Sequence, residues 1–175
     1  FESAQAASRI LFWATVAALL VIFLLIYGEF RSVPLSAIVM LSLPLALIGG
    51  VLAVLLTSRV VSIPSIIGFI TLFGIATRNG ILLISNYRHL AQQGVPVAER
   101  VMRGSLDRLN PILMTALTSA LALIPLVLTG DKPGNEIQSP MAVVVLGGLL
   151  TSTLLNIYVM PVIYSRYATR KEVSL

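Results

Sequence analysis

The sequence predicts an all-α polytopic membrane protein with five transmembrane helices, and its composition and hydropathy pattern support this fold class. Of its 175 residues, 57% are hydrophobic and 11% are charged, whereas roughly 25% of residues are charged in soluble domains. A bilayer crossing needs about 20 apolar residues, so the length allows five or six crossings and leaves no room for a separate soluble domain. Five apolar runs without acidic residues lie at 10–28, 34–57, 65–87, 112–129 and 141–164.

Short polar or turn-forming segments separate most of these runs. Residues 29–32 separate the first two runs, and residues 58–64 separate the second from the third. Residues 130–135, which combine Gly, Pro and charged side chains, separate the last two runs. Gly and Pro clusters of this kind mark turns between regular elements. Each apolar run is therefore expected to form one helix.

The longer segment between the third and fourth runs predicts a short interfacial helix at 95–109. Its apolar residues fall on one helical face, with most of its charged residues on the other, and this pattern is typical of a helix at a membrane surface. Pro96 suits the first turn of such a helix. We interpret the segment as a connector on the inner membrane surface, and the alternative is a dedicated lipid or partner site.

Basic residues predict the orientation, because positively charged loops stay in the cytoplasm. One side carries Arg31, Arg88, Arg100, Arg103, Arg108, Arg166, Arg170 and Lys171. The other side carries Arg9, Arg59 and Lys132. The bias predicts a periplasmic N-terminus and a cytoplasmic C-terminus for this chain. Phe1 is expected to be an internal residue of a longer protein, since the chain begins without Met and crosses an odd number of times from outside.

The residue inventory disfavours several other kinds of function. The chain has no cysteine and one histidine, His89, at the end of the third run, so we expect no disulfide framework, no metal site within the chain and no cofactor. An intramembrane enzyme would need a nucleophile and a base at membrane depth, and no acidic residue lies there. The net charge of +5 is explained by membrane orientation and does not indicate nucleic-acid binding.

Arg78 is the most informative residue, because it lies in the middle of the third apolar run. A guanidinium at that depth costs a few kcal/mol on insertion scales, so such residues face a bundle interior, a partner or water. Helical spacing places Thr71, Gly74 and Ser85 on the same stripe as Arg78. This polar and small-residue stripe is expected to face other helices. The alternative is an arginine that snorkels toward the membrane surface or only packs.

No carboxylate in the sequence is well placed to pair with Arg78. Every acidic residue falls in a loop or near the end of a run: Glu2, Glu29, Glu99, Asp107, Asp131, Glu136 and Glu172. A buried arginine needs an anion, so we expect its partners to be carboxylates on transmembrane helices outside this chain. Protonation of those carboxylates would release the arginine, as in a proton relay.

Other polar residues at membrane depth are Thr115 and Thr118 in the fourth run and Asn156 in the fifth. Asn156 is expected at a depth similar to that of Arg78. These residues could support a relay around Arg78. The alternative for each of them is an ordinary hydrogen bond between or within helices.

Two segments of this sequence are familiar. Residues 74–82 read Gly-Ile-Ala-Thr-Arg-Asn-Gly-Ile-Leu, and residues 108–115 read Arg-Leu-Asn-Pro-Ile-Leu-Met-Thr. They resemble the tenth and eleventh transmembrane helices of resistance-nodulation-division (RND) efflux permeases, and the whole chain resembles helices eight to twelve in order. Residues 1–3, 134–141 and 147–149 resemble the heavy-metal efflux branch, which handles cobalt, zinc and cadmium or copper and silver.

The resemblance implies that the chain is a fragment of a larger RND fold. It further implies a homotrimeric pump of the bacterial inner membrane that joins a periplasmic adaptor and an outer-membrane channel, and that exchanges a metal cation for protons. The other readings left open are an RND exporter of drugs or other hydrophobic compounds and an RND-like exporter of proteins or lipids.

The resemblance also implies roles for particular residues. In the family a basic residue of the tenth helix pairs with aspartates of the fourth helix, near a threonine of the eleventh. These roles fall on Arg78 and Thr115, with Asn79 beside Arg78 and Arg108 at the inner end of the relay. The family's multidrug branch usually has Lys where this chain has Arg78. Because arginine holds its proton more firmly, the titrating groups here would be the carboxylates outside the chain.

Overall fold

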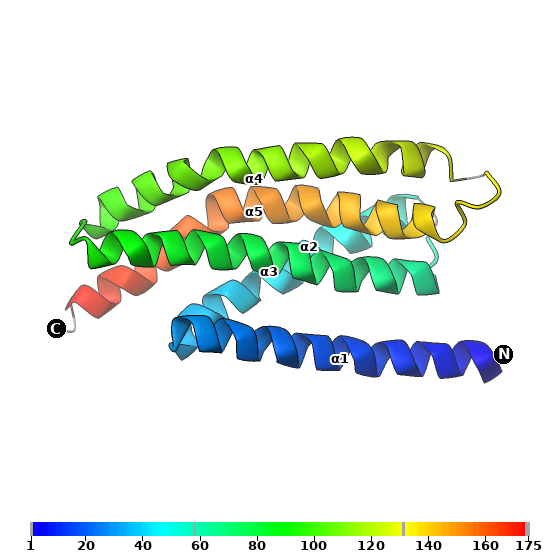
Figure 1. Cartoon of the computed structure of the whole chain (residues 1–175), viewed down its shortest axis with the longest axis horizontal. Helices are drawn as coiled ribbons and strands as arrows, with labels where there is room; N and C mark the ends of the chain where they lie inside the picture. The colour runs from blue at the N-terminus through cyan, green and yellow to red at the C-terminus, as the bar shows by residue number, and fades with distance from the viewer. Residues whose placement is uncertain (1, 58, 131, 174–175) are drawn as a thin grey trace.

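The protein forms a bundle of long helices in a computed structural model that describes residues 2–57, 59–130 and 132–173 (Figure 1). In these residues the helices are α1 (Glu2–Phe30), α2 (Val33–Leu56), α3 (Ile63–Gln92), α4 (Val97–Leu128) and α5 (Gln138–Val173). All five are long and apolar enough to cross a membrane. The predicted all-α class with five membrane-spanning helices is confirmed, and the chain is a multi-pass membrane protein.

Local sequence explains where several helices begin and end. Arg31 adopts a left-handed backbone with φ of 46° directly after α1, and Gly94 does the same with φ of 76° between α3 and α4. The Ser62 side chain caps α3 by accepting a hydrogen bond from the Ser65 backbone nitrogen at 3.4 Å. Pro34 and Pro64 occupy the first turns of α2 and α3, where a missing N–H costs nothing because that group has no intrahelical partner.

The predicted interfacial helix at 95–109 is not a separate element. Residues 97–109 and the predicted fourth span form the single helix α4, which continues through Pro111. Pro111 removes one backbone hydrogen bond from the helix, but contacts with α3 hold the N-terminal part in line. The Asn86 side chain donates to the Gly104 carbonyl at 3.0 Å, and Tyr87 hydrogen-bonds Ser105 at 2.5 Å. Tertiary packing therefore overrides the break expected at the proline.

Helix α5 lies at the centre of the bundle, in contact with α2, α3 and α4 (Figure 1). Small residues allow its close approach to α2. A Cβ added to Gly147 would lie 2.7 Å from the carbonyl oxygen of Gly49 and 2.4 Å from the Ala53 Cβ. The two backbones thus touch directly, as small residues permit in membrane bundles.

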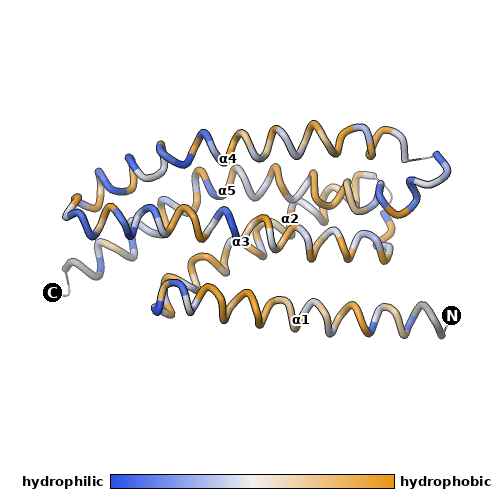
Figure 2. The backbone as a smooth tube through the Cα atoms, in the orientation of Figure 1, coloured by the Kyte–Doolittle hydropathy of each residue, from blue (hydrophilic) through white to orange (hydrophobic). Residues whose placement is uncertain are grey.

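Two helices leave most of their apolar surface uncovered within this chain. In the membrane-length segments, 6% of residues are buried in α1 and 11% in α4, against 44% in α2 and α3 and 50% in α5. Figure 2 shows hydrophobic residues along much of α1, including its outward side. Among the described side chains of α1, the fully buried ones lie at its C-terminal end, Ile26 and Phe30. These surfaces suit contact with lipid or with further helices.

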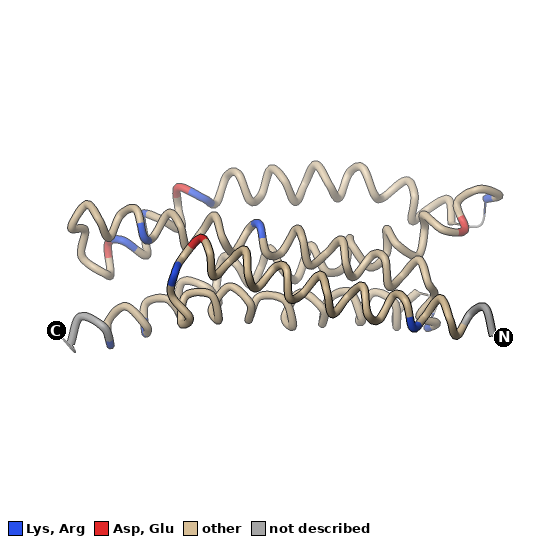
Figure 3. The backbone as a smooth tube through the Cα atoms, turned by 60° about the horizontal axis from the view of Figure 1, so that its bottom comes forward, with Lys and Arg blue, Asp and Glu red and all other residues tan. Residues whose placement is uncertain are grey.

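Charged residues gather toward the two ends of the bundle, with more basic ones at the end that holds the C-terminus of α3 and the N-terminus of α4 (Figure 3). Among the described residues, this end contains arginines that the sequence predicts to be cytoplasmic. The distribution agrees with helices that run across a membrane.

Candidate functional site

A recess of about 50 Å³ lies between α3 and α4 near the middle of the bundle. It is lined by Arg78, Asn79, Leu82, Arg108, Pro111, Ile112 and Thr115. All four residues named from the sequence as the relay therefore line one recess. Residues of α4 at positions 108, 111 or 112, and 115 share a helical face, which explains how Arg108 and Thr115 come to flank it together.

The packing of α3 determines the direction of Arg78. Ala76, Asn79, Gly80 and Leu83 are buried on the side of α3 that meets the rest of the bundle. A Cβ on Gly80 would lie 3.1 Å from a Val39 methyl carbon of α2 and 3.7 Å from the Met160 methyl carbon of α5. Because this face is filled, Arg78 must project from the opposite side.

Arg78 is exposed, and so are Thr71 and Gly74 on the same stripe of α3, whereas Ser85 is half-buried. Within the described residues the Arg78 guanidinium has neither a hydrogen bond nor an ion pair. Arg78 lies 15 residues after Ile63 and 14 before Gln92 in a 30-residue helix, or about 22 Å from each end. A cation at this depth is costly in lipid, so we expect Arg78 to face water or a polar group.

The recess holds two cations and no acid. Arg78 and Arg108 both line it, and neither Asp nor Glu does. Two guanidinium groups in a small, partly apolar recess repel each other unless anionic groups lie between them or beside them. The electrostatics of the recess therefore favour carboxylates as the groups that complete it.

The hydroxyl proton of Thr115 is already used in a hydrogen bond. Its Oγ1 donates to the Pro111 carbonyl at 2.8 Å, within the same helix. A hydroxyl that has donated its proton keeps its lone pairs, so Thr115 can accept a hydrogen bond from a cation or water in the recess. The acceptor is the carbonyl of Pro111 itself, the residue whose missing N–H interrupts the backbone hydrogen bonds of α4.

The supporting polar residues named from the sequence lie elsewhere. Thr71 is exposed and donates to the Ile67 carbonyl at 3.0 Å, and Thr118 is exposed on α4 outside the recess. Asn156 is 1% exposed and lines a different cavity between α4 and α5. Its Nδ2 donates to Ser152 Oγ at 3.4 Å, and its Oδ1 has no partner among the described residues. The structure does not bring these three residues to Arg78.

Three wall residues of the recess and one buried neighbour were not singled out from the sequence. Its apolar walls are formed by Leu82, Pro111 and Ile112. Each lies three or four residues from Arg78 or Thr115, so helical spacing alone could have predicted that they share the recess. Thr77 is 7% exposed, and its Oγ1 has no partner in the described part of the chain. Its position next to Arg78 was the available signal.

The described residues hold no group of three or more His, Asp or Glu side chains that could bind a metal ion. Any metal selected by the whole protein would need ligands from other segments.

Within the described residues, five membrane-length helices and a recess lined by two arginines define a multi-pass helical membrane protein. Residues 1–168 match the AcrB/AcrD/AcrF family, so the chain belongs to this family of RND permeases. It is 40% identical over 98% of its length to the cobalt-zinc-cadmium resistance protein CzcA of Cupriavidus metallidurans. It is 37% identical over the same share to the nickel-cobalt-cadmium resistance protein NccA of Alcaligenes xylosoxydans xylosoxydans.

The structural comparison agrees with these relatives. A crystal structure of a heavy metal efflux pump matches 97% of the chain with a TM-score of 0.85 and 37% identity. The resemblance to RND permeases and to their heavy-metal branch is confirmed. The chain spans 16% of the length of each of the two relatives and 17% of the solved chain.

Proposed function

We propose that the whole protein containing this chain exports heavy-metal cations by proton antiport, and that the Arg78 recess is part of its proton relay. The observation that carries the relay is the recess itself, where Arg78 and Arg108 meet without an acid. The heavy-metal relatives support the choice of substrate, because their names specify resistance to cobalt, zinc, cadmium or nickel.

The relay depends on carboxylates from helices outside this chain. When these groups are ionised they pair with Arg78. Uptake of protons neutralises them and removes the attraction. Arg78 then turns toward a neutral acceptor of the recess, the Thr115 hydroxyl, and α3 and α4 shift relative to each other.

The assembly proposed for the whole protein follows the family. It is a homotrimer in the bacterial inner membrane that joins a periplasmic adaptor and an outer-membrane channel. The more basic end of the bundle (Figure 3) is the cytoplasmic end, since positive charge is retained there. The chain thus enters the membrane from the periplasm and ends in the cytoplasm.

The test is transport by the full-length protein in proteoliposomes with an imposed pH gradient. Zn²⁺, Co²⁺, Cd²⁺ and Ni²⁺ are offered to the wild type, to Arg78→Ala and to Arg9→Ala, an exposed arginine of α1 outside the recess. We expect metal-coupled proton flux in the wild type and in Arg9→Ala, and none in Arg78→Ala. Full activity of Arg78→Ala would refute the relay.

The substrate proposal is tested separately in the same vesicles. If none of the metals moves but a hydrophobic drug moves in an Arg78-dependent way, the relay stands and the metal substrate is wrong. The protein would then belong with the exporters of drugs or other hydrophobic compounds.

A further inference from the structure

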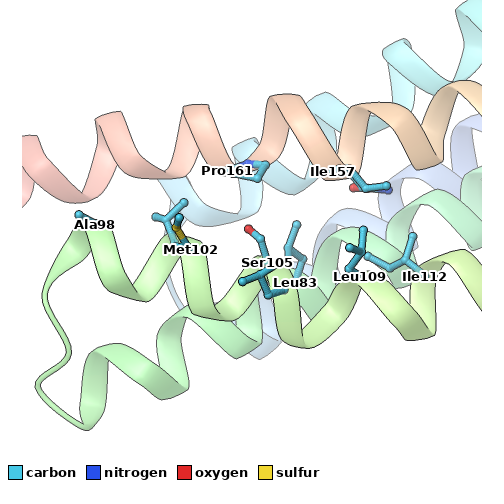
Figure 4. Close-up of a pocket in the computed structure, with 11 residues that line it drawn as sticks. Leu83, Ala98, Met102, Ser105, Leu109, Ile112, Ile157 and Pro161 are labelled. Carbon is cyan, nitrogen blue, oxygen red and sulfur yellow. The ribbon is translucent and has the colours of Figure 1, made fainter.

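A second and larger recess, of about 460 Å³, lies between α4 and α5. Figure 4 shows Met102, Ser105 and Leu109 of α4 on one side of it and Ile157 and Pro161 of α5 on the other. Ile112 is the one residue that lines both this recess and the Arg78 recess. The volume falls in the range of small-molecule sites, about 300–1,000 Å³, and the lining is mainly apolar.

The depth of this recess matches the boundary between lipid tails and head groups. Counting back from Leu128, the 20 residues to Arg108 rise about 30 Å, which equals the hydrocarbon thickness of a bilayer. Leu109 and Ile112 therefore lie just inside the hydrocarbon, and Arg103 lies about 8 Å beyond it, at the level of the phosphates. The recess runs along α4 from the head groups toward the tails.

A charged recess of about 430 Å³ adjoins the apolar one and shares Ala98, Met102 and Leu106 with it. Its charged lining consists of Glu99, Arg103 and Asp107, which follow one another at single-turn spacing on α4. All three are exposed, and within the described part of the chain none of them forms an ion pair or a side-chain hydrogen bond. One cation flanked by two carboxylates is thus available to an external group.

We infer that the two adjoining recesses bind a phospholipid whose head group carries both a phosphate and a primary ammonium, as in phosphatidylethanolamine. One acyl chain lies in the apolar recess along Met102, Leu109 and Ile112. The phosphate meets the guanidinium of Arg103, and the ammonium donates to Glu99 or Asp107.

The charge pattern selects this head group over two others. A purely anionic head group, as in phosphatidylglycerol, meets repulsion from the two carboxylates that flank Arg103. A trimethylated ammonium, as in phosphatidylcholine, has no N–H to donate to them. The inference concerns a lipid site and does not rest on the proposed metal transport.

The experiment uses the full-length protein, purified and delipidated in detergent, and native mass spectrometry to count bound lipids. Phosphatidylethanolamine, phosphatidylcholine and phosphatidylglycerol with identical acyl chains are titrated separately. We expect phosphatidylethanolamine to bind about fivefold more tightly than either of the other two lipids, which is the gain in affinity from one exposed charge contact. Equal binding of all three, or no binding because other helices of the whole protein cover the recess, would overturn the inference.

Variants separate the three contacts. Arg103→Ala is expected to weaken phosphatidylethanolamine and phosphatidylcholine alike by about fivefold, because both lose the phosphate contact. Glu99→Gln combined with Asp107→Asn should bring phosphatidylethanolamine to the level of phosphatidylcholine. Leu109→Trp should fill the apolar recess and reduce binding of all lipids.

Arg170→Ala is the matched control, since Arg170 is an exposed arginine near the end of α5 that lines neither recess. It should leave lipid binding unchanged. Because Arg103 is itself exposed, its substitution does not threaten folding. If Arg103→Ala and Arg170→Ala bind lipid equally, the assignment of the phosphate to Arg103 is wrong and the site is refuted.

Discussion

The close contact between α2 and α5 predicts that Gly147→Ala destabilises the bundle. The added Cβ would lie 2.7 Å from the Gly49 carbonyl oxygen and 2.4 Å from the Ala53 Cβ. Ordinary separations are about 3.3–3.6 Å for carbon to oxygen and about 3.5–4.0 Å for carbon to carbon. The two helices must therefore move apart by about 1 Å, which weakens the van der Waals contacts of the side chains packed between them.

The magnitude follows from two opposing effects. Overpacking of this kind costs about 1–3 kcal/mol, and replacing a mid-helix glycine by alanine returns about 0.5–1 kcal/mol. The net loss is about 1 kcal/mol. Gly28→Ala in α1 is the matched control, because a Cβ at Gly28 meets nothing within 4 Å. That variant gains the helix-propensity term without a clash, so the two variants should differ by about 2 kcal/mol.

The assay is equilibrium unfolding of the full-length protein in mixed micelles, with increasing denaturing detergent and helix content as the signal. Gly147→Ala should unfold at a lower detergent fraction than the wild type, and Gly28→Ala at the same or a higher one. If both variants shift in the same direction by the same amount, the α2–α5 contact is not as close as the structure has it.

Three further predictions concern side-chain hydrogen bonds. Thr115→Val should reduce proton-coupled transport by about 10-fold or more, because it loses a hydrogen bond to a charged group. Thr115→Ser should retain most of the transport activity. Equal transport rates for the two variants would show that Thr115 is not part of the relay. Arg88→Gln removes the guanidinium that donates to the Glu29 and Phe30 carbonyls at 3.3 and 3.2 Å. Amide hydrogen exchange at the C-terminal end of α1 should therefore accelerate. Unchanged exchange rates would show that Arg88 does not hold that end of α1. Tyr87→Phe removes the hydroxyl bonded to Ser105 and should lower the free energy of unfolding by about 1 kcal/mol; a variant as stable as the wild type would show that this bond makes no net contribution.

The resemblance to RND permeases named the four polar residues that line the Arg78 recess; helical spacing explains their arrangement, and their role in a relay stays a prediction. Arg78 and Asn79 are adjacent, and Arg108 and Thr115 are seven residues apart, so each pair occupies a defined part of one helix. The sequence also predicts that the partners of Arg78 are carboxylates outside this chain, which stays a prediction; within the described residues the guanidinium has no ion pair. Both inferences depend on depth and helical register, which hydropathy fixes in a membrane protein.

Contacts between helices were less predictable. The continuity of α4 through Pro111 depends on Tyr87 and Asn86 of α3, which hold the segment before the proline in place. Asn156 was expected near Arg78 because the two share a depth, but depth does not fix which way a side chain points around its helix axis. Asn156 lies on α5 beside a different cavity. Rotation about the helix axis is set by packing, as at Gly147 and Gly49, and a single sequence does not reveal it.

The position of Ile112 joins the two sites on α4. It is 7% exposed and contributes to both the Arg78 recess and the apolar recess at the lipid boundary. A movement of α4 that follows protonation of the partners of Arg78 would therefore move a wall of the lipid recess at the same time. By thermodynamic linkage, a lipid that binds one position of α4 more tightly must also favour one protonation state of the relay. The two proposals thus become linked if α4 moves as one body, and its unbroken course from Val97 to Leu128 supports such a movement.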